Sequence, residues 1–242
     1  MEKVILFSGG YDSTYLLNQI MQEEKSVTVV SIRSNTLSKN KVLREIKARK
    51  IILDYLKAKY YNCKVTEIGA EINLDSIGSA YGLAQPLLWL PFMQMLVMSG
   101  DYELNFSYIC DDQATIHMDD FKKILEYSKH FQYNDKNISI NFPLRYYHKK
   151  DIINKLVKQD KFLFENATSC ESVKDKQFCG ECIPCKCLKS TLIDLYCDNN
   201  TSEEDKEYYK NFLKDKFDAN ISYYESINVE KDTNCELILK ED

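Results

Sequence analysis

The chain has 242 residues, of which 44% are hydrophobic and 29% charged, with 17 tyrosines and 11 phenylalanines. This length and composition are typical of a folded protein with a sizeable core, and they exclude extensive intrinsic disorder. From Asp198 onward there are 13 acidic and 6 basic residues, so the first 197 residues carry a net charge of only +2, which disfavours bulk binding of DNA or RNA.

Nothing in the sequence indicates a membrane or secreted protein. The longest apolar run, Leu87–Met98, has 12 residues and contains Pro91, whereas a membrane helix needs about 20. The apolar stretch at the N-terminus is too short for a signal peptide. We therefore expect a cytoplasmic location, where clustered cysteines bind metal in preference to forming disulfides.

Short apolar runs alternate with longer amphipathic segments up to about residue 157. The predicted strands are Val4–Phe7, Val27–Ile32, Val65–Ile68, Leu104–Ile109 and Ile138–Phe142. The predicted helices are Ser13–Glu24, Asn40–Tyr60, Gln85–Ser99, Asp119–His130 and Lys149–Val157. This alternation predicts an α/β fold with a doubly wound parallel sheet, which binds ligands at the carboxyl ends of its strands.

Composition changes divide the chain into three predicted parts: a main domain over residues 1–165, a cysteine-rich segment over 166–198 and an acidic extension over 199–242. Ser202 and Asp205 have capping-box spacing before a predicted helix at Glu203–Phe217, and Ile221–Val229 could add an edge strand. The extension holds the pairs Tyr208-Tyr209 and Tyr223-Tyr224. We expect a protein contact there, either in a homodimer or with a separate partner.

A glycine loop follows the first predicted strand, in the segment Ser8-Gly9-Gly10-Tyr11-Asp12-Ser13. Glycines allow close approach of a ligand to the backbone, and the amides of the following helix form an anion site. The alternative is a tight turn with Asp12 or Ser13 as an ordinary N-cap. The pattern Ser-Gly-Gly-x-Asp-Ser would match by chance on the order of once in several thousand such chains. No lysine follows the glycines, so the loop is not a Walker loop.

Four cysteines, Cys170, Cys179, Cys182 and Cys185, follow the spacing C-x8-C-x2-C-x2-C. Four thiolates satisfy a tetrahedral zinc ion and leave no position open for water, which favours a structural site. An iron–sulfur cluster is the alternative.

The glycine loop resembles the pyrophosphate-binding loop of the N-type ATP pyrophosphatases, which cleave ATP between its α and β phosphates. The resemblance implies that Asp12 helps to organise Mg²⁺ and that adenine lies near the end of the second strand. The ATP-binding residues that it implies are Phe7, Ser8, Gly9, Gly10, Asp12, Ser13, Thr14 and Arg33.

Together, the loop and the cysteine spacing resemble the 7-cyano-7-deazaguanine synthase (QueC) family over residues 1 to about 197. Pro143-Leu144 followed by Lys149, Asp151 and Ile152 is similar to a segment of that family, which makes Lys149 a candidate phosphate-contacting catalytic residue beside Asp12. The alternative is a solvated lysine at a helix start. The implied reaction activates the carboxylate of 7-carboxy-7-deazaguanine with ATP and uses ammonia to form an amide and then a nitrile.

The chain departs from the family pattern where the purine is expected. Pro91-Phe92-Met93-Gln94 replaces the usual Pro-Ala-Arg-Asn, and Ile116–Asp120 replaces Tyr-Pro-Asp-Cys-Arg. The remaining candidate substrate contacts are Asp111, Asp112, His117 and Asp119. Two other functions therefore stay open. One is a paralogue in a bacterial defence system that passes the activated deazapurine to a protein amine, and the other is a non-catalytic, zinc-stabilised nucleotide-binding subunit.

Overall fold

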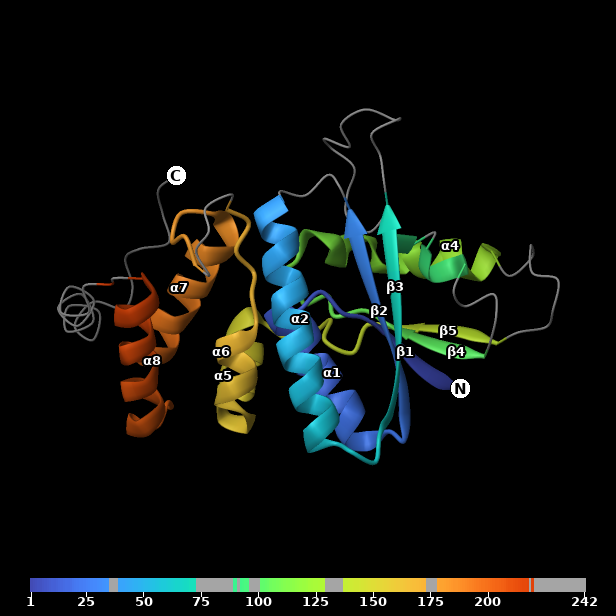
Figure 1. Ribbon diagram of the computed structural model, residues 1–242. Coiled ribbons are helices and arrows are strands. Elements are labelled where there is room, and N and C mark those ends of the chain that lie inside the picture. The colour runs from blue at the N-terminus through green and yellow to red at the C-terminus, as the bar shows by residue number, and fades with distance from the viewer. Residues whose placement is uncertain are drawn as a thin grey trace. The chain divides into compact units, whose positions relative to one another are not determined.

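Figure 1 shows the computed structural model, which describes residues 1–34, 39–72, 89–90, 92–95, 101–128, 137–172, 178–217 and 219. The chain divides into two compact units, the first spanning Met1–Ser169 and the second beginning at Cys170. None of the described helices is long and apolar enough to cross a membrane.

The first unit is built on a five-stranded parallel sheet. In spatial order its strands are β3 (Lys64–Ile72), β2 (Ser26–Ser34), β1 (Glu2–Leu6), β4 (Tyr102–Asn105) and β5 (Ile138–Asn141). The chain proceeds outward from β1 to β3 and then returns to the other side of β1 for β4 and β5. The strand order therefore reverses between β1 and β4, and ligands of such sheets bind at the carboxyl ends of the strands at this switch point.

Helices cover both faces of this sheet, as the connections between parallel strands require. Figure 1 shows α1 (Tyr11–Glu23) and α2 (Lys39–Lys59) on one face and α4 (Met118–Ser128) on the other. On the first face α5 (Lys149–Gln159) packs against α1, and α6 (Lys161–Asn166) packs against α2. The predicted doubly wound α/β fold is therefore confirmed.

The sheet is fixed by apolar side chains from the strands and from α4. Val4, Val30 and Leu104 are at most 2% exposed and belong to one core cluster with Phe121 and Leu125 of α4. Strands that alternate with helices bury both faces, so their apolar runs are nearly continuous, and this is why the strands could be predicted from the sequence.

Asp160 joins three helices of the first unit. Its Oδ2 accepts hydrogen bonds from the Tyr55 hydroxyl and the Lys59 ammonium of α2, each at 2.7 Å. Its Oδ1 accepts from the backbone N–H groups of Phe162 and Leu163 and so caps α6. Burial alone would raise the pKa of Asp160, but the hydrogen bonds from Lys59 and Tyr55 outweigh it and lower the pKa.

The prediction extended the fourth strand to Ile109, whereas β4 ends at Asn105. The Phe106 N–H still bonds to the Asn141 carbonyl, but the Ile109 N–H donates to the Asp112 carboxylate at 3.0 Å. The chain therefore turns at the carboxyl end of the sheet because a side chain, and not a neighbouring strand, accepts the next amide. This turn places Cys110, Asp111 and Asp112 just beyond the carboxyl end of β4.

The second unit contains α7 (Ile183–Tyr196) and α8 (Glu203–Phe217), which pack against each other. Ser202 Oγ accepts from the Asp205 N–H at 3.2 Å and donates to the Asp205 carboxylate at 2.8 Å, which ties the predicted cap residues together at the start of α8. The structure differs from the predicted boundary near residue 199, because α7 and α8 lie in one unit. Their apolar faces supply the reason: Leu188, Leu192, Leu195, Tyr209, Phe212 and Leu213 are buried.

Burial also changes the interpretation of the acidic extension. Tyr209 is fully buried in the second unit, so it cannot serve as an anchor for a partner. Residues 220–242, with Tyr223-Tyr224 and the predicted strand Ile221–Val229, lie outside the described residues, and a protein contact there stays a prediction.

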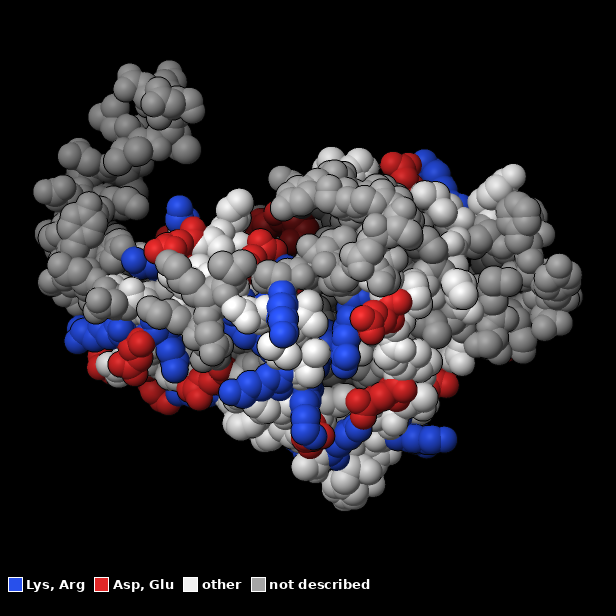
Figure 2. All heavy atoms as spheres, turned by 45° about the horizontal axis from the view of Figure 1, so that its top comes forward, with Lys and Arg blue, Asp and Glu red and all other residues white. Residues whose placement is uncertain are grey.

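On the face shown in Figure 2, Lys and Arg side chains are interspersed with Asp and Glu.

Candidate functional site

The glycine loop leaves the carboxyl end of β1 and leads directly into α1. The Phe7 N–H bonds to the Val30 carbonyl at 2.8 Å, which holds the last residue before the loop to β2. Gly9 has φ +82°, and a Cβ there would lie 3.2 Å from the backbone nitrogen of Arg49. Both the backbone conformation and the close approach of α2 therefore require glycine.

The hydroxyl groups of Ser8 and Ser13 connect the loop to the first turn of α1. Ser8 Oγ accepts from the Gly10 N–H at 3.2 Å and lies 3.1 Å from Ser13 Oγ, while Ser13 Oγ donates to the Gly10 carbonyl. Gly10 is the N-cap of α1 and has no side chain that could accept from the amides of the first turn. The N-terminus of α1 therefore has the features of an anion site, with amide donors and a favourable helix dipole.

Asp12 and Lys149 meet beside this loop although 137 residues separate them in sequence. The Lys149 ammonium donates to Asp12 Oδ2 at 2.6 Å, and both side chains are about one-fifth exposed. Asp12 Oδ1 is buried and has no hydrogen-bond partner. A buried carboxylate oxygen without a partner fits a hard cation such as Mg²⁺, which prefers oxygen ligands. The two residues that the resemblance pointed to as catalytic are thus in direct contact.

Two further hydroxyls near the loop have no hydrogen-bond partner and are buried: Thr14 Oγ1 and Thr168 Oγ1. Thr168 is held to the loop by its N–H, which donates to the Gly9 carbonyl at 2.9 Å. A buried hydroxyl left without a partner costs free energy, and a bound nucleotide would supply acceptors for both groups. Thr168 could not be predicted from the sequence, because it reaches the loop only through the fold and belongs to no motif.

Arg49 of α2 is the second residue that sequence analysis missed. It is 8% exposed, its Cγ packs against Gly9, and its guanidinium lies 3.8 Å from the Glu45 carboxylate. Burial lowers the pKa of Arg49. The negative charge of Glu45 raises this pKa, and the positive charge of Arg33 lowers it further. Arg33, predicted to contact ATP, therefore lies within electrostatic reach of Arg49 at the exposed end of β2. The positive charge of Arg49 beside the loop, with Arg33 within its electrostatic reach, favours an anionic ligand.

Asp111 and Asp112 lie on the turn after β4, next to Lys149. Asp111 Oδ2 accepts from the Lys149 backbone N–H at 2.7 Å. Burial would raise the pKa of Asp111, but hydrogen bonds from Lys149 and His148 lower it. Burial raises the pKa of Asp112, and the charge of Asp12 adds to the effect. Both predicted substrate residues thus lie just beyond the carboxyl end of β4, and both already accept hydrogen bonds from backbone N–H groups.

His117 and Asp119 lie farther along, on the 3-10 helix Gln113–His117 and at the start of α4. Both side chains are mostly exposed, and their ion pairs are with Asp120 at 4.0 Å and Arg145 at 3.9 Å. The structure therefore gives them no contact with the glycine loop. Their proposed role as substrate contacts stays a prediction.

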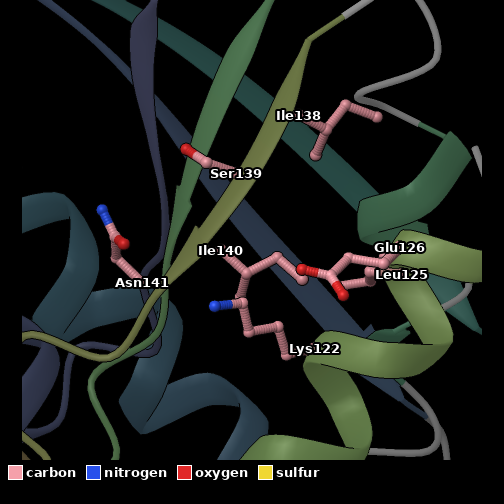
Figure 3. Close-up of a pocket in the computed structure, with 7 residues that line it drawn as sticks. All are labelled: Lys122, Leu125, Glu126, Ile138, Ser139, Ile140 and Asn141. Carbon is pink, nitrogen blue, oxygen red and sulfur yellow. The ribbon is translucent and has the colours of Figure 1, made fainter.

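A separate cavity of ≈ 280 Å³ lies between α4 and β5 (Figure 3). Its lining comprises Lys122, Leu125, Glu126 and residues Ile138–Asn141. None of these is among the predicted site residues. β4 separates β5 from β1, so the cavity does not belong to the glycine-loop site.

The cysteine cluster lies in the second unit. The sulfur atoms of Cys170, Cys179, Cys182 and Cys185 all lie within 4.8 Å of one another. Burial would raise the pKa of Cys179, but the backbone N–H groups of Cys182 and Glu181 and neighbouring thiols lower it to about 6. Burial raises the pKa of Cys170 and of Cys185. The fold therefore favours the thiolate form of Cys179, whereas a bound cation would be needed to stabilise the thiolates of Cys170 and Cys185.

The cluster geometry fits one metal ion. With a metal–sulfur distance of about 2.3 Å, tetrahedral coordination places the sulfurs about 3.8 Å apart. Gly180, at φ +74°, makes the turn between Cys179 and Cys182. Cys187, two residues beyond Cys185, is exposed and is not part of the cluster. The predicted set of four cysteines is thus brought together.

Among the solved structures, 33 chains are similar to this chain, and three of them are described here. A predicted subunit of tRNA methyltransferase from Methanocaldococcus jannaschii is 16% identical, with 63% of this chain and 72% of that chain covered and a TM-score of 0.40. The U34-tRNA thiolase NcsA from Methanococcus maripaludis with its [4Fe-4S] cluster is 14% identical, with 88% and 72% covered and a TM-score of 0.45. NMN synthetase from Francisella tularensis is 12% identical, with 89% and 86% covered and a TM-score of 0.41.

No curated protein matches the chain. Residues 95–195 match the family model described as "Queuosine biosynthesis protein QueC". This match includes Lys149 and all four cysteines of the cluster, while the glycine loop precedes it. It supports an ATP-using enzyme that modifies a nucleotide or its base. The resemblance to the QueC family that the motifs indicated is thus confirmed for residues 95–195, which make up less than half of the chain.

Proposed function

We propose that the protein is a QueC-like enzyme that uses ATP to activate the carboxylate of a 7-deazapurine such as 7-carboxy-7-deazaguanine, with release of pyrophosphate. Ammonia then attacks the activated carboxylate to give the amide and, after a second activation, the nitrile. The observation that carries this proposal is the contact at 2.6 Å between Lys149 and Asp12, which joins the QueC-matched segment to the glycine loop.

The loop residues would bind the β and γ phosphates of ATP. The N-terminus of α1 offers backbone amides, and the hydroxyls of Ser8 and Ser13 lie next to it. The Lys149 ammonium contacts Asp12 in the first turn of the same helix. As pyrophosphate leaves, negative charge grows on its oxygens, and donors already in place stabilise this charge without reorganisation. Mg²⁺ held by Asp12 would supply a further positive charge to the same oxygens.

The carboxylate needs this activation because hydroxide is a poor leaving group. Attachment of AMP converts the carboxylate oxygen into part of a good leaving group, which a neutral amine can then displace. The turn after β4 carries Asp111 and Asp112 next to Lys149. These carboxylates would accept hydrogen bonds from the purine edge while the substrate carboxylate faces ATP.

A second candidate transfers the activated deazapurine to a protein amine. Met93 occupies the place of the arginine in the family pattern and is fully buried in the core under α4. A buried methionine cannot supply the charged contact that an arginine would, which favours a changed acceptor or substrate. An acyl-adenylate reacts with any well-placed amine, so the same first step serves both candidates.

For the cysteine cluster we propose a structural zinc ion. The span of at most 4.8 Å between sulfurs is close to that of a mononuclear tetrahedral site. A four-iron cluster places iron and sulfide between the cysteine sulfurs and holds them farther apart. Four protein ligands leave no open position, so the ion would stabilise the second unit and not take part in the reaction.

The test is an incubation of the full chain with ATP, Mg²⁺ and 7-carboxy-7-deazaguanine, with and without ammonia, followed by chromatography. AMP, pyrophosphate and an amide or nitrile product are expected. AMP and pyrophosphate formed only when a protein amine is supplied would favour the second candidate. ADP and phosphate as the sole products would refute α–β cleavage, and ATP binding without turnover under all conditions would identify a non-catalytic subunit.

A further inference from the structure

A second group of metal-ligating atoms lies on the first unit, at the carboxyl end of β4. Cys110 Sγ, an Asp111 carboxylate oxygen and a ring nitrogen of His148 all lie within 4.8 Å of one another. Cys110 Sγ is 3.1 Å from His148 Nδ1, Asp111 Oδ1 is 2.9 Å from the same nitrogen, and the sulfur is 3.6 Å from Asp111 Oδ1. Thiol, carboxylate and imidazole thus converge from the turn after β4 and from the start of α5.

This arrangement is not that of a catalytic triad. In a Cys-His-Asp triad the thiol and the carboxylate bind opposite nitrogens of the imidazole, so that a proton can pass from sulfur to the ring. Here both Sγ and Oδ1 approach Nδ1. A single nitrogen cannot donate to the carboxylate and accept from the thiol at once, so the group is poorly arranged for nucleophilic catalysis.

The distances instead resemble the edges of a coordination polyhedron. Tetrahedral zinc bound by one sulfur, one nitrogen and one oxygen places these donors about 3.3–3.6 Å from one another. The observed separations of 3.1, 2.9 and 3.6 Å lie within a few tenths of an ångström of those values. We propose that Cys110, Asp111 and His148 form a binding site for a divalent transition-metal ion of the zinc type, distinct from the four-cysteine cluster.

The surroundings hold these donors in place. Asp111 Oδ2 accepts from the Lys149 backbone N–H at 2.7 Å, which orients the carboxylate and leaves Oδ1 for the metal. The Cys110 N–H donates to the Tyr147 carbonyl at 3.1 Å, and the His148 N–H donates to the Asp151 carboxylate at 2.9 Å. Such outer contacts that fix the first ligands are a regular feature of metal sites.

Three protein donors leave a fourth tetrahedral position for water or a ligand atom. The Asp111 and His148 side chains are 45% and 68% exposed, so an ion could enter from solvent. His148 immediately precedes Lys149 in the sequence. An ion bound to Cys110, Asp111 and His148 would therefore link the turn after β4 to the N-terminus of α5. The metal affinity should be lower than that of the cysteine cluster, because only one ligand is a thiolate and the site is open.

The experiment measures bound zinc per chain in the full-length protein after dialysis against buffered, micromolar free Zn²⁺ under reducing conditions. We expect the wild type to bind one equivalent more than each of the variants Cys110→Ser and His148→Ala. His117→Ala, which removes another exposed histidine, is the matched control and should bind as much as the wild type. Asp111→Asn keeps the shape of the side chain and should weaken the same equivalent.

Circular dichroism and thermal melting in metal-free buffer would establish that each variant is folded. The zinc content is compared only among variants that are folded. Co²⁺ in place of Zn²⁺ gives a second readout, since loss of one thiolate ligand in Cys110→Ser should remove part of the sulfur-to-metal absorption. Equal zinc content in the wild type, Cys110→Ser and His148→Ala would overturn the proposal. The result does not depend on whether the protein turns over ATP.

Discussion

Replacement of Lys149 by glutamine tests the proposed phosphate chemistry directly. The Lys149 ammonium lies 2.6 Å from Asp12 Oδ2, and Coulomb's law at an effective dielectric constant of about 20 gives a gross attraction of about 6 kcal/mol at that distance. Part of this is offset by desolvation, and both side chains are about one-fifth exposed. Loss of one such donor in other active sites costs about 3–4 kcal/mol, or about 100- to 1000-fold in turnover.

We therefore expect Lys149→Gln to lower the rate of pyrophosphate release by about 100- to 1000-fold while the protein stays folded. The assay is a coupled measurement of pyrophosphate at saturating ATP, with thermal melting as the check on folding. Lys158→Gln is the matched control, because Lys158 is exposed in the last turn of the same helix and carries the same charge. Turnover of Lys149→Gln within about threefold of the wild type would refute the reasoning, since a solvated lysine would behave in this way.

Three further predictions concern stability. Asp160→Ala should lower the free energy of unfolding by about 2–3 kcal/mol, because the α6 cap and two hydrogen bonds to α2 are lost together. Since the pKa of Asp160 is lowered on folding, this difference should be complete above about pH 4 and shrink as the pH falls below it. Urea melts at several pH values would measure it, and a gap that widens in acid would contradict the assignment. Gly9→Ala should cost more than about 1 kcal/mol, because φ is +82°. Gly69→Ala, whose Cβ meets nothing within 4 Å, should be close to neutral in the same melts. Cys182→Ser should abolish the metal bound by the cluster and lower Tm, whereas Cys187→Ser should do neither, and the reverse pattern in metal analysis would show that the ligand set is wrong.

Local patterns in the sequence were sufficient for the five strands, for α1, α2, α4 and α5, and for the glycine loop. The short helix α6 was not predicted, and most of the predicted helix Gln85–Ser99 lies outside the described residues. The strands are short apolar runs, and the two glycines followed by Asp12 and Ser13 form a pattern that seldom arises by chance. Lys149 could be named only through the resemblance, and its contact with Asp12 is a finding of the fold. Residue patterns predict the conformation of a single helix, strand or loop. They do not predict contacts between elements that are distant in the sequence.

The residues that were missed show the same limit. Thr168 and Arg49 reach the loop from segments far along the chain, and neither belongs to a recognisable pattern. Tyr209 was interpreted as an exposed anchor although it is buried. Here the signal was present, because Tyr209, Phe212 and Leu213 are spaced as one apolar face of a helix.

The arrangement at the start of α5 explains how substrate preference could change while the phosphate chemistry is kept. The side chain of Lys149 faces Asp12 of the loop, whereas its backbone N–H is held by Asp111 on the turn after β4. In the proposed reaction, phosphate contacts would come from the loop between β1 and α1, and substrate contacts would come from the turn after β4 and the segments around it. A change such as Met93, which is buried and precedes β4, would then alter the substrate contacts without disturbing the phosphate contacts. Asp111 is the exception, because its loss would release the Lys149 backbone as well as a substrate contact. We therefore expect Asp111→Ala to slow pyrophosphate release with every acceptor tested, while changes at His117 or Asp119, which make no contact with the loop, should alter only the choice of substrate.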